Sequence, residues 1–291
     1  MTFLLSLLKP TFLSNPYFLC QILTSMTKSI NFFTEIYFQW LTTTKLVELV
    51  IIVSISVFFA AALTVPAGFG LSTMVTPLIL LILPPHEAIA VVAIIHGIHN
   101  AVKYAVLKEF LDIEAVKKYG IWLVFGALMG ASLQGFVPED PLLIVIGIFL
   151  ITLPLLSLSE KWTGYRIPEA NDRLGGFGSG FMGGLSGHQG ALRAMFLKRR
   201  LTDKMSYAAT ASVLALCVDL SRIPVYLFFN GGDIVQHIQI TALLSFCAIL
   251  GVKSGKRFLE KAKTKSIQVG ISLGIVFSGV YYIYTALHDK L

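Results

Sequence analysis

The chain has 291 residues, of which 55% are hydrophobic and only 13% are charged, and its mean hydropathy is +0.77. This composition excludes an ordinary soluble domain, and the alternating ten-residue strands of an outer-membrane barrel are absent. The net charge of +7 does not indicate nucleic-acid binding, because the Lys and Arg residues fall in short loops beside apolar segments. We therefore predict an all-α, polytopic protein that lies in a lipid bilayer.

Residues 1–45 do not resemble a signal peptide. Lys9 is the only early cation, Pro10 and Pro16 interrupt the apolar run, and no small-x-small cleavage pattern stands out. We expect an N-terminal extension at the periphery of the protein. Met26 is an alternative start, so the sequence leaves open whether residues 1–45 belong to the mature protein.

Ten apolar segments follow, separated by Gly, Pro and charged residues. The polar stretch 159–173 divides them into two sets of five, so we expect a first repeat over 46–158, a cytoplasmic linker over 159–173 and a second repeat over 174–287. The expected segments are 46–66, 69–83, 88–107, 120–136 and 141–158, then 174–187, 190–201, 205–229, 237–255 and 265–287.

An offset of 119 residues relates the two halves. The pairs that this offset aligns are Gly68 with Gly187, Asn100 with Asp219, and Lys103 with Arg222. In each half the first two segments are short or broken by glycine, so the chain returns to the side it left. Three further segments then bring the second half to the opposite face. We therefore predict inverted repeats with Gly-rich broken helices near the midplane.

Loop charge gives the orientation, because cytoplasmic loops retain Lys and Arg. This topology puts sixteen of the 23 Lys and Arg residues on the linker face and three inside the segments. The remaining four, Lys9, Lys28, Lys45 and Lys290, lie on the other face. Both termini are predicted to lie outside the cytoplasm. The absence of a eukaryotic targeting signal favours a bacterial inner membrane.

The two glycine turns are candidates for ligand contact, since irregular backbone at membrane depth is tolerated where it lines a cavity. Glycine allows a tight turn and close backbone approach, and a helix N-terminus at such a turn favours an anion. For each single glycine, close helix packing is the alternative. The candidates for backbone approach are Gly68, Gly70, Gly187 and Gly190, and those for polar contact are Ser72, Thr73, His188 and Gln189.

These motifs resemble the TauE/SafE sulfite-exporter family over roughly 46–287. The resemblance is carried by Gly68-Phe-Gly70, Pro77, the Leu-Pro-Pro-His-Glu-Ala run at 83–88 and Gly-Ala-Leu-Met-Gly-Ala at 126–131. In the second half, Gly184-Leu-Ser-Gly187 fits, whereas Gln189, Ala191 and Phe196 depart from the family pattern. The resemblance implies transport of small sulfur-containing anions, such as sulfite or organosulfonates, without a bound organic cofactor.

Three cations lie within apolar segments, where charge is costly and usually functional. Arg193 follows the second glycine turn and could bind an oxyanion bidentately, or it could snorkel toward the basic loop 198–200. Lys103 and Arg222 are candidate gating charges, although Lys103 could reach the interface. Asp219 lies three residues before Arg222, so the two could form a structural pair or a coupling device released by protonation.

Histidines supply candidate proton carriers. His96 and Asn100 share a helix face, His99 is nearby, and His188 lies in the second glycine turn, with hydrogen-bonded packing as the alternative for each. These residues do not complete a metal motif, so we predict no metal site. The isolated cysteines show no Cys-x-x-Cys spacing.

We predict a secondary transporter, not an enzyme, that moves a small anion by alternating access. A coupling ion, a proton or sodium, is an expected partner, whereas the anion, the direction of transport and the oligomeric state stay open. A passive anion channel is an alternative. A rhomboid-like protease is a more distant one, since Ser186 lies in a Gly-x-Ser-Gly pattern and His237 follows about fifty residues later.

Overall fold

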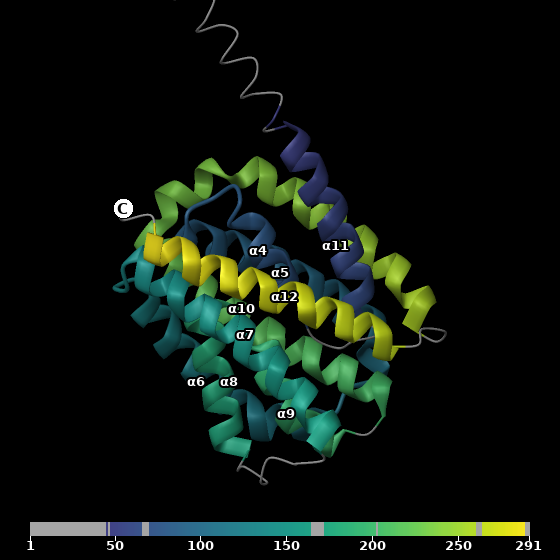
Figure 1. The fold of residues 1–291 in the computed structure, drawn as a ribbon. Helices are drawn as coiled ribbons and strands as arrows, with labels where there is room; N and C mark the ends of the chain where they lie inside the picture. The colour runs from purple at the N-terminus through teal and green to yellow at the C-terminus, as the bar shows by residue number, and fades with distance from the viewer. Residues whose placement is uncertain are drawn as a thin grey trace, which may run out of the picture. The chain divides into compact units, whose positions relative to one another are not determined.

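The computed structural model describes residues 47–65, 70–163, 172–201, 203–259 and 264–288, together with Lys45. Within these residues the regular elements are helices and no strand occurs (Figure 1). Four described helices are long and apolar enough to cross a membrane: Val47–Val65, Pro85–Phe110, Lys204–Gln236 and Ile238–Gly255. The predicted all-α membrane fold is confirmed.

Each of the ten predicted segments overlaps with an α-helix of the described residues. After the helix Val47–Val65 come α4 (Leu71–Ile79), α5 (Pro85–Leu107), the short 3-10 helix η1 (Lys108–Phe110), α6 (Ile113–Gln134) and α7 (Glu139–Thr163). The second half contains α8 (Asp172–Ser186), α9 (Gly190–Arg200), α10 (Lys204–Gln236), α11 (Ile238–Leu259) and α12 (Thr264–His288).

Helices α6 and α10 begin before the predicted apolar segments, and a side chain caps each of them. The Asp112 carboxylate accepts from the Ala115 N–H at 2.8 Å, so α6 begins seven residues before the apolar run that predicted it. Asp203 caps α10 in the same way through the Ser206 N–H. The far end of α10 continues past Asn230, whose non-helical φ of −132° marks a kink.

Helix bounds recur between the two halves. Helices α4 and α9 begin 119 residues apart, at 71 and 190, and so do α5 and α10, at 85 and 204. Helices α6 and α11 both have 22 residues, α7 and α12 both have 25, and each of these pairs begins 125 residues apart. The offset between equivalent helices increases from 119 to 125 residues after α10. This increase coincides with the greater length of α10, which has 33 residues against 23 in α5.

Glycine stripes bring two helix pairs into close backbone contact. On α8, a Cβ at Gly180 or Gly184 would collide with the carbonyl of Leu123 or Ala127 of α6. Gly126 and Gly130 of α6 face the α8 backbone in return, and Gly251 and Gly255 of α11 face Phe58 and Ala62 of the helix Val47–Val65. For these glycines the packing interpretation holds, as in other membrane helix pairs.

Two further helix pairs pack along one another. Helices α7 and α12 run side by side, with Gly147 and Gly279 at close backbone approach, and α5 packs along α10 (Figure 1). One buried apolar cluster of the described residues joins α5, α6, α7, α10 and α12 and includes Leu142, Ile146, Leu150 and Tyr226. Helices α5 and α10 carry the buried charges Lys103, Asp219 and Arg222, whereas the buried Arg193 lies on α9.

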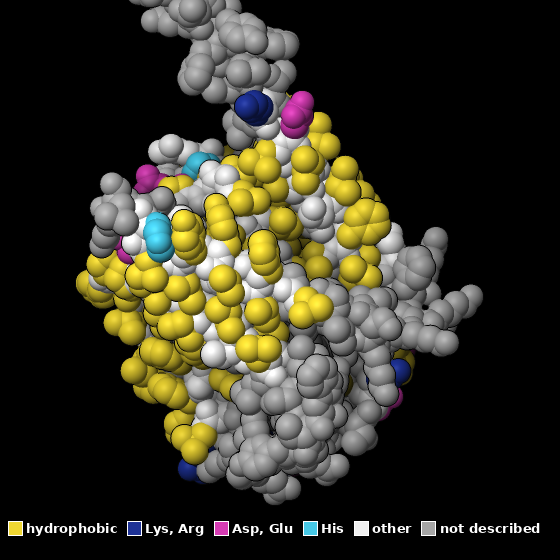
Figure 2. Space-filling model, viewed as in Figure 1, with side chains coloured by type: hydrophobic (Ala, Val, Ile, Leu, Met, Phe, Trp, Pro, Cys, Tyr) yellow, Lys and Arg dark blue, Asp and Glu magenta, His cyan; other side chains and the backbone are white. Residues whose placement is uncertain are grey.

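The described surface is apolar over broad areas, and Figure 2 shows one such face. Among the described residues, large hydrophobic side chains such as Phe59 and Phe277 are more than half exposed. A face of this kind is unfavourable in water and suits contact with lipid. Ion pairs lie at the helix ends. Arg200 pairs with Asp172 and Glu114, and His237 pairs with Glu87.

Candidate anion-binding site

The turn between α8 and α9 is built on a left-handed glycine. Gly187 follows the last residue of α8 and has φ +83°, and its N–H donates to the Gly183 carbonyl at 3.1 Å. A side chain at this position would be strained and would meet the Arg222 guanidinium at 3.3 Å. The turn then places His188 and Gln189 ahead of α9, which begins at Gly190, and all of these residues are buried.

The turn before α4 also contains a glycine with a positive φ, but at another repeat position, since the 119-residue offset aligns Gly70 with Gln189, whose φ is −78°. Gly70 has φ +108° and precedes the first residue of α4, with no side-chain cap. Gly68 lies outside the described residues. Ser72 and Thr73 are buried in the first turn of α4.

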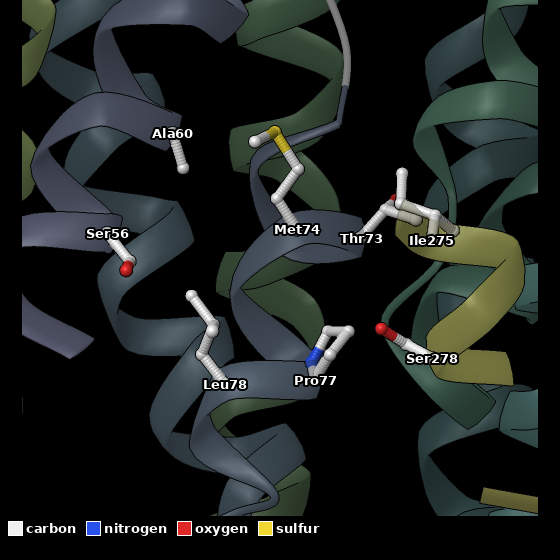
Figure 3. A pocket seen from close by; sticks show the side chains of 8 residues that line it. All are labelled: Ser56, Ala60, Thr73, Met74, Pro77, Leu78, Ile275 and Ser278. Atoms are coloured by element: carbon white, nitrogen blue, oxygen red, sulfur yellow. The ribbon is translucent and has the colours of Figure 1, made fainter. Parts of the chain in front are cut away.

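Thr73 lines a pocket of about 270 Å³ between α4, α12 and the helix Val47–Val65 (Figure 3). Its lining is largely apolar and contains no Lys or Arg: Ser56, Ala60, Thr73, Met74, Pro77, Leu78, Ile275 and Ser278. Helix α4 therefore lies beside an apolar pocket in the described part of the chain.

Arg193 turns back toward the N-terminus of its own helix. Its Nη1 donates to the Gln189 Oε1 at 3.1 Å, and the side chain is only 2% exposed. The guanidinium thus lies one helical turn from the glycine turn and does not snorkel toward the basic residues at 198–200. Its charge adds to the positive end of the α9 dipole, so both favour an anion at this place.

Several buried polar atoms around this turn lack a hydrogen-bond partner among the described residues. They are both ring nitrogens of His188, the Nε2 of Gln189 and the Nε of Arg193. Buried donors are rarely left unpaired, because each one costs about 1–3 kcal/mol. Four such atoms on three residues of one turn and helix start indicate a place for a polar ligand or water.

Lys103 of α5 contributes a second buried cation. It is 2% exposed, which contradicts the interpretation that it reaches the membrane interface. No carboxylate of the described residues forms an ion pair with Lys103 or Arg193. Both cations are therefore buried without an ion-pair partner in the described part of the chain.

Asp219 of α10 is the centre of a separate buried network. Its Oδ1 accepts from the Nη2 and Nε of Arg222 at 2.7 and 3.0 Å, and its Oδ2 lies 2.7 Å from the His96 Nδ1. The Asn100 amide donates to the His96 carbonyl at 2.8 Å. The predicted pairing of Asp219 with Arg222 is present, and His96 extends it across to α5.

Arg222 connects this network to the glycine turn. Its Nη1 donates to the Gly183 carbonyl at 2.7 Å, and the Tyr226 hydroxyl donates to the Gly184 carbonyl. Both carbonyls belong to the last turn of α8, where a cation is favoured by the helix dipole. Arg222 thus fixes the end of α8 that presents His188.

Thr64 is a polar residue beside the site that the sequence analysis did not identify as a candidate. It is 2% exposed, its Oγ1 lies 3.5 Å from the His99 Nε2, and its methyl group lies nearest to Gly70. A Thr within an apolar segment gives no signal of its own, so only the packed structure reveals this position.

The protease alternative requires a hydrogen bond between Ser186 and His237. In the structure each of these side chains bonds to another residue. The Ser186 hydroxyl donates to the Met182 carbonyl, and His237 binds Glu87 at 2.6 Å. Among the residues with described positions, no Ser186–His237 hydrogen bond forms. In that same part of the chain no group of three His, Cys, Asp or Glu side chains could hold a metal ion.

Comparison with known proteins gives one match. The family model described as "Sulfite exporter TauE/SafE" matches residues 53–282, a stretch that contains both glycine turns and all the buried charges described above. The resemblance deduced from the sequence motifs is therefore confirmed. No curated protein and no solved structure matches the chain significantly.

Proposed function

Because this chain belongs to the sulfite exporter TauE/SafE family of membrane transporters, we propose that it carries sulfite or an organosulfonate across the membrane by alternating access. One observation supports an anionic substrate above all others. Arg193 and Lys103 are buried and form no ion pair with a described carboxylate, and Arg193 lies beside a turn with unpaired polar atoms. Such an arrangement is stabilised when an anion binds.

In this proposal, the second glycine turn holds the oxyanion. The planar guanidinium of Arg193 offers parallel N–H groups to two oxygens, and Gln189 and His188 supply further donors. Gly187 and Gly190 let the backbone approach the ligand, and the α9 N-terminus adds its dipole. Gly68, Gly70, Ser72 and Thr73 of the first half are proposed to complete the site in at least one state of the transport cycle.

We propose that the two halves move against one another. The recurring helix bounds support repeats over 46–158 and 174–287, joined by a linker over 159–173 on the cytoplasmic face. Repeats that are inverted in the membrane exchange roles when the site opens to one side and then the other. Both termini are proposed to lie outside the cytoplasm, in a bacterial inner membrane.

Asp219 is the proposed coupling residue, with a proton as the coupling ion. Both of its oxygens are engaged by nitrogen groups, from Arg222 on α10 and His96 on α5, which leaves little room to coordinate sodium. Protonation of Asp219 or its release from His96 would loosen Arg222 from the end of α8. Asn100, bound to His96, and Lys103 are proposed to respond on the α5 side.

The test is flux into proteoliposomes with the full chain, with an imposed pH gradient present or absent. The panel contains sulfite, sulfoacetate, taurine and a carboxylate. We expect saturable movement of a sulfur oxyanion that the gradient drives against its concentration. A flux that never exceeds equilibrium would indicate a passive channel instead.

A matched pair of variants tests the site on one helix. Arg193→Ala should abolish flux while the protein stays folded, because the charge beside the turn is lost. Arg200→Ala, at the exposed end of α9, removes the same type of side chain and should leave flux close to wild type. Unchanged flux in Arg193→Ala would remove this residue from the proposed site.

A further inference from the structure

The end of α10 has no counterpart in the first half. The 119-residue offset aligns Asn230 with Leu111, where the first half leaves its helix after η1 and the backbone becomes extended. Helix α10 instead continues past Asn230 to Gln236. These six added residues, 231–236, account for the increase in the offset from 119 to 125. Together with His237, which follows the helix, we call them the α10 extension.

The backbone at the start of the α10 extension is suited to bending. Asn230 interrupts the helix with φ −132° and ψ 28°, and two glycines follow it directly. A Cβ at Gly231 or Gly232 would lie in open space, so close helix packing does not require a glycine at either position. Glycines free of such contacts give the backbone conformational freedom, and hinges in proteins consist of a few residues of this kind at an element end.

Ile234 and His237 attach the α10 extension to the first half of the chain. Ile234 is 3% exposed and belongs to the apolar cluster that includes Ile89 of α5. The His237 Nε2 lies 2.6 Å from the Glu87 Oε2 at the start of α5. The other side chains of the extension are exposed or half-buried. A segment with so little buried surface opens more easily than the packed core.

The kink at the start of the α10 extension lies against the end of α6. A Cβ at Gly135 would lie 2.7 Å from the Phe229 ring, and the ring centroids of Phe136 and Phe229 are 5.3 Å apart. Gln134, the last residue of α6, is 1% exposed, and both polar atoms of its side chain lack a partner among the described residues. Such a buried amide is costly, which favours a state in which water or a ligand reaches it.

We propose that the α10 extension is a lid over the end of the transport path that opens outside the cytoplasm. The lid pivots at residues 230–232, the His237–Glu87 bond holds it closed, and opening exposes the Gln134 amide to water and substrate. This inference rests on the proposed function, which supplies the path and its orientation. Because Glu87 belongs to the first half and His237 to the second, their bond joins the two halves that alternating access would separate.

Labelling of a cysteine at position 134 measures how often the lid opens. Gln134→Cys is made in the full chain with its three native cysteines replaced by alanine, and a water-soluble maleimide is added to the protein in lipid nanodiscs. Adding His237→Ala should speed the labelling about two- to fivefold, as expected when a partly exposed charged pair is lost. Val235→Ala shortens an exposed side chain of the same extension and should leave the rate unchanged. Equal rates with and without His237→Ala would overturn the proposed role of the bond.

A reversible cross-link tests the lid without a substitution at position 134. The pair Glu87→Cys and His237→Cys is joined by a short reagent that forms a disulfide with each thiol. Anion flux into proteoliposomes should be lost on cross-linking and should return when a reductant releases the reagent. The same treatment of either single-cysteine variant should leave flux unchanged. Undiminished flux in the cross-linked protein would overturn the lid.

The two assays separate this inference from the broader proposal, because labelling does not require transport. Flux that persists while the extension is cross-linked overturns the lid and leaves anion transport standing. If the wild-type chain moves no anion of the panel while His237→Ala still speeds labelling, the proposed function is overturned, and the extension moves for another reason.

Discussion

The Asp219–Arg222 pair should behave as one energetic unit. Asp219→Asn leaves the Arg222 guanidinium buried without its carboxylate, and Arg222→Met leaves the carboxylate buried without the guanidinium. The structure places two bonds of 2.7 and 3.0 Å between these side chains, both fully buried. Breaking such a pair from one side costs about 3–5 kcal/mol, because one charge stays unpaired.

The double variant should cost far less than the sum of the single ones. Independent effects would add to about 6–10 kcal/mol, whereas removal of both charges avoids the unpaired state and should cost about 3–5 kcal/mol. The Gly183 carbonyl loses Arg222 in the double variant but keeps the Gly187 N–H as a donor. The coupling energy should therefore be about 3–5 kcal/mol.

Reversible unfolding of the full chain in mixed detergent micelles measures the cycle. The surface pair Glu114–Arg200, at 3.4 Å, serves as control, and its cycle should give about 0–1 kcal/mol. Additive costs for Asp219 and Arg222 would refute the conclusion that these residues neutralise each other. Equal coupling at the surface pair would show that the assay does not distinguish buried charge.

Three further substitutions test the turn and the packing, each by the melting temperature of the purified protein. Gly180→Leu should destabilise by about 1–3 kcal/mol or more because its side chain enters the α6 backbone, whereas Gly231→Ala, with open space around it, should not. Gly187→Ala should cost about 1–2 kcal/mol for the left-handed backbone and should also reduce anion flux; unchanged stability and flux would contradict the turn geometry. Tyr226→Phe removes a donor from the end of α8 and should cost about 1 kcal/mol.

Hydropathy predicted where helices lie more reliably than where they begin. The segment predicted over 120–136 is the apolar part of α6, but the helix starts at Ile113. The first turn is charged and was assigned to a loop, although Asp112 caps it and Lys118 pairs with Glu114. Apolar runs report burial in lipid, whereas the helix end depends on a local hydrogen bond that hydropathy does not measure.

The repeat spacing predicted the two turns, but the sequence did not predict which glycines turn the chain and which pack helices. Gly187 has a positive φ, whereas Gly180 and Gly184, four residues apart, lie against α6. Both kinds look alike in the sequence. Only the position of the neighbouring backbone distinguishes them, and that depends on tertiary structure.

Contacts between residues far apart in the sequence were the part of the site that was hardest to predict. Sequence spacing predicted that Asp219 and Arg222 could pair, since three residues on a helix bring side chains together. It could not bring His96 to Asp219 across 123 residues, because that contact depends on how α5 packs along α10. The same packing buries Lys103, which local spacing had placed within reach of the interface.

The glycine stripes determine which parts of the molecule can change position. Helix α6 meets α8 backbone to backbone, and α11 meets residues 58–62 in the same way. These contacts have no flexible side chain between the two backbones, so each helix pair should move as one rigid unit. Sliding is easier between α5 and α10, where Gly97 meets the Asp219 side chain and not backbone. The glycine contacts would thereby confine movement to a surface that carries Lys103, Asp219 and Arg222.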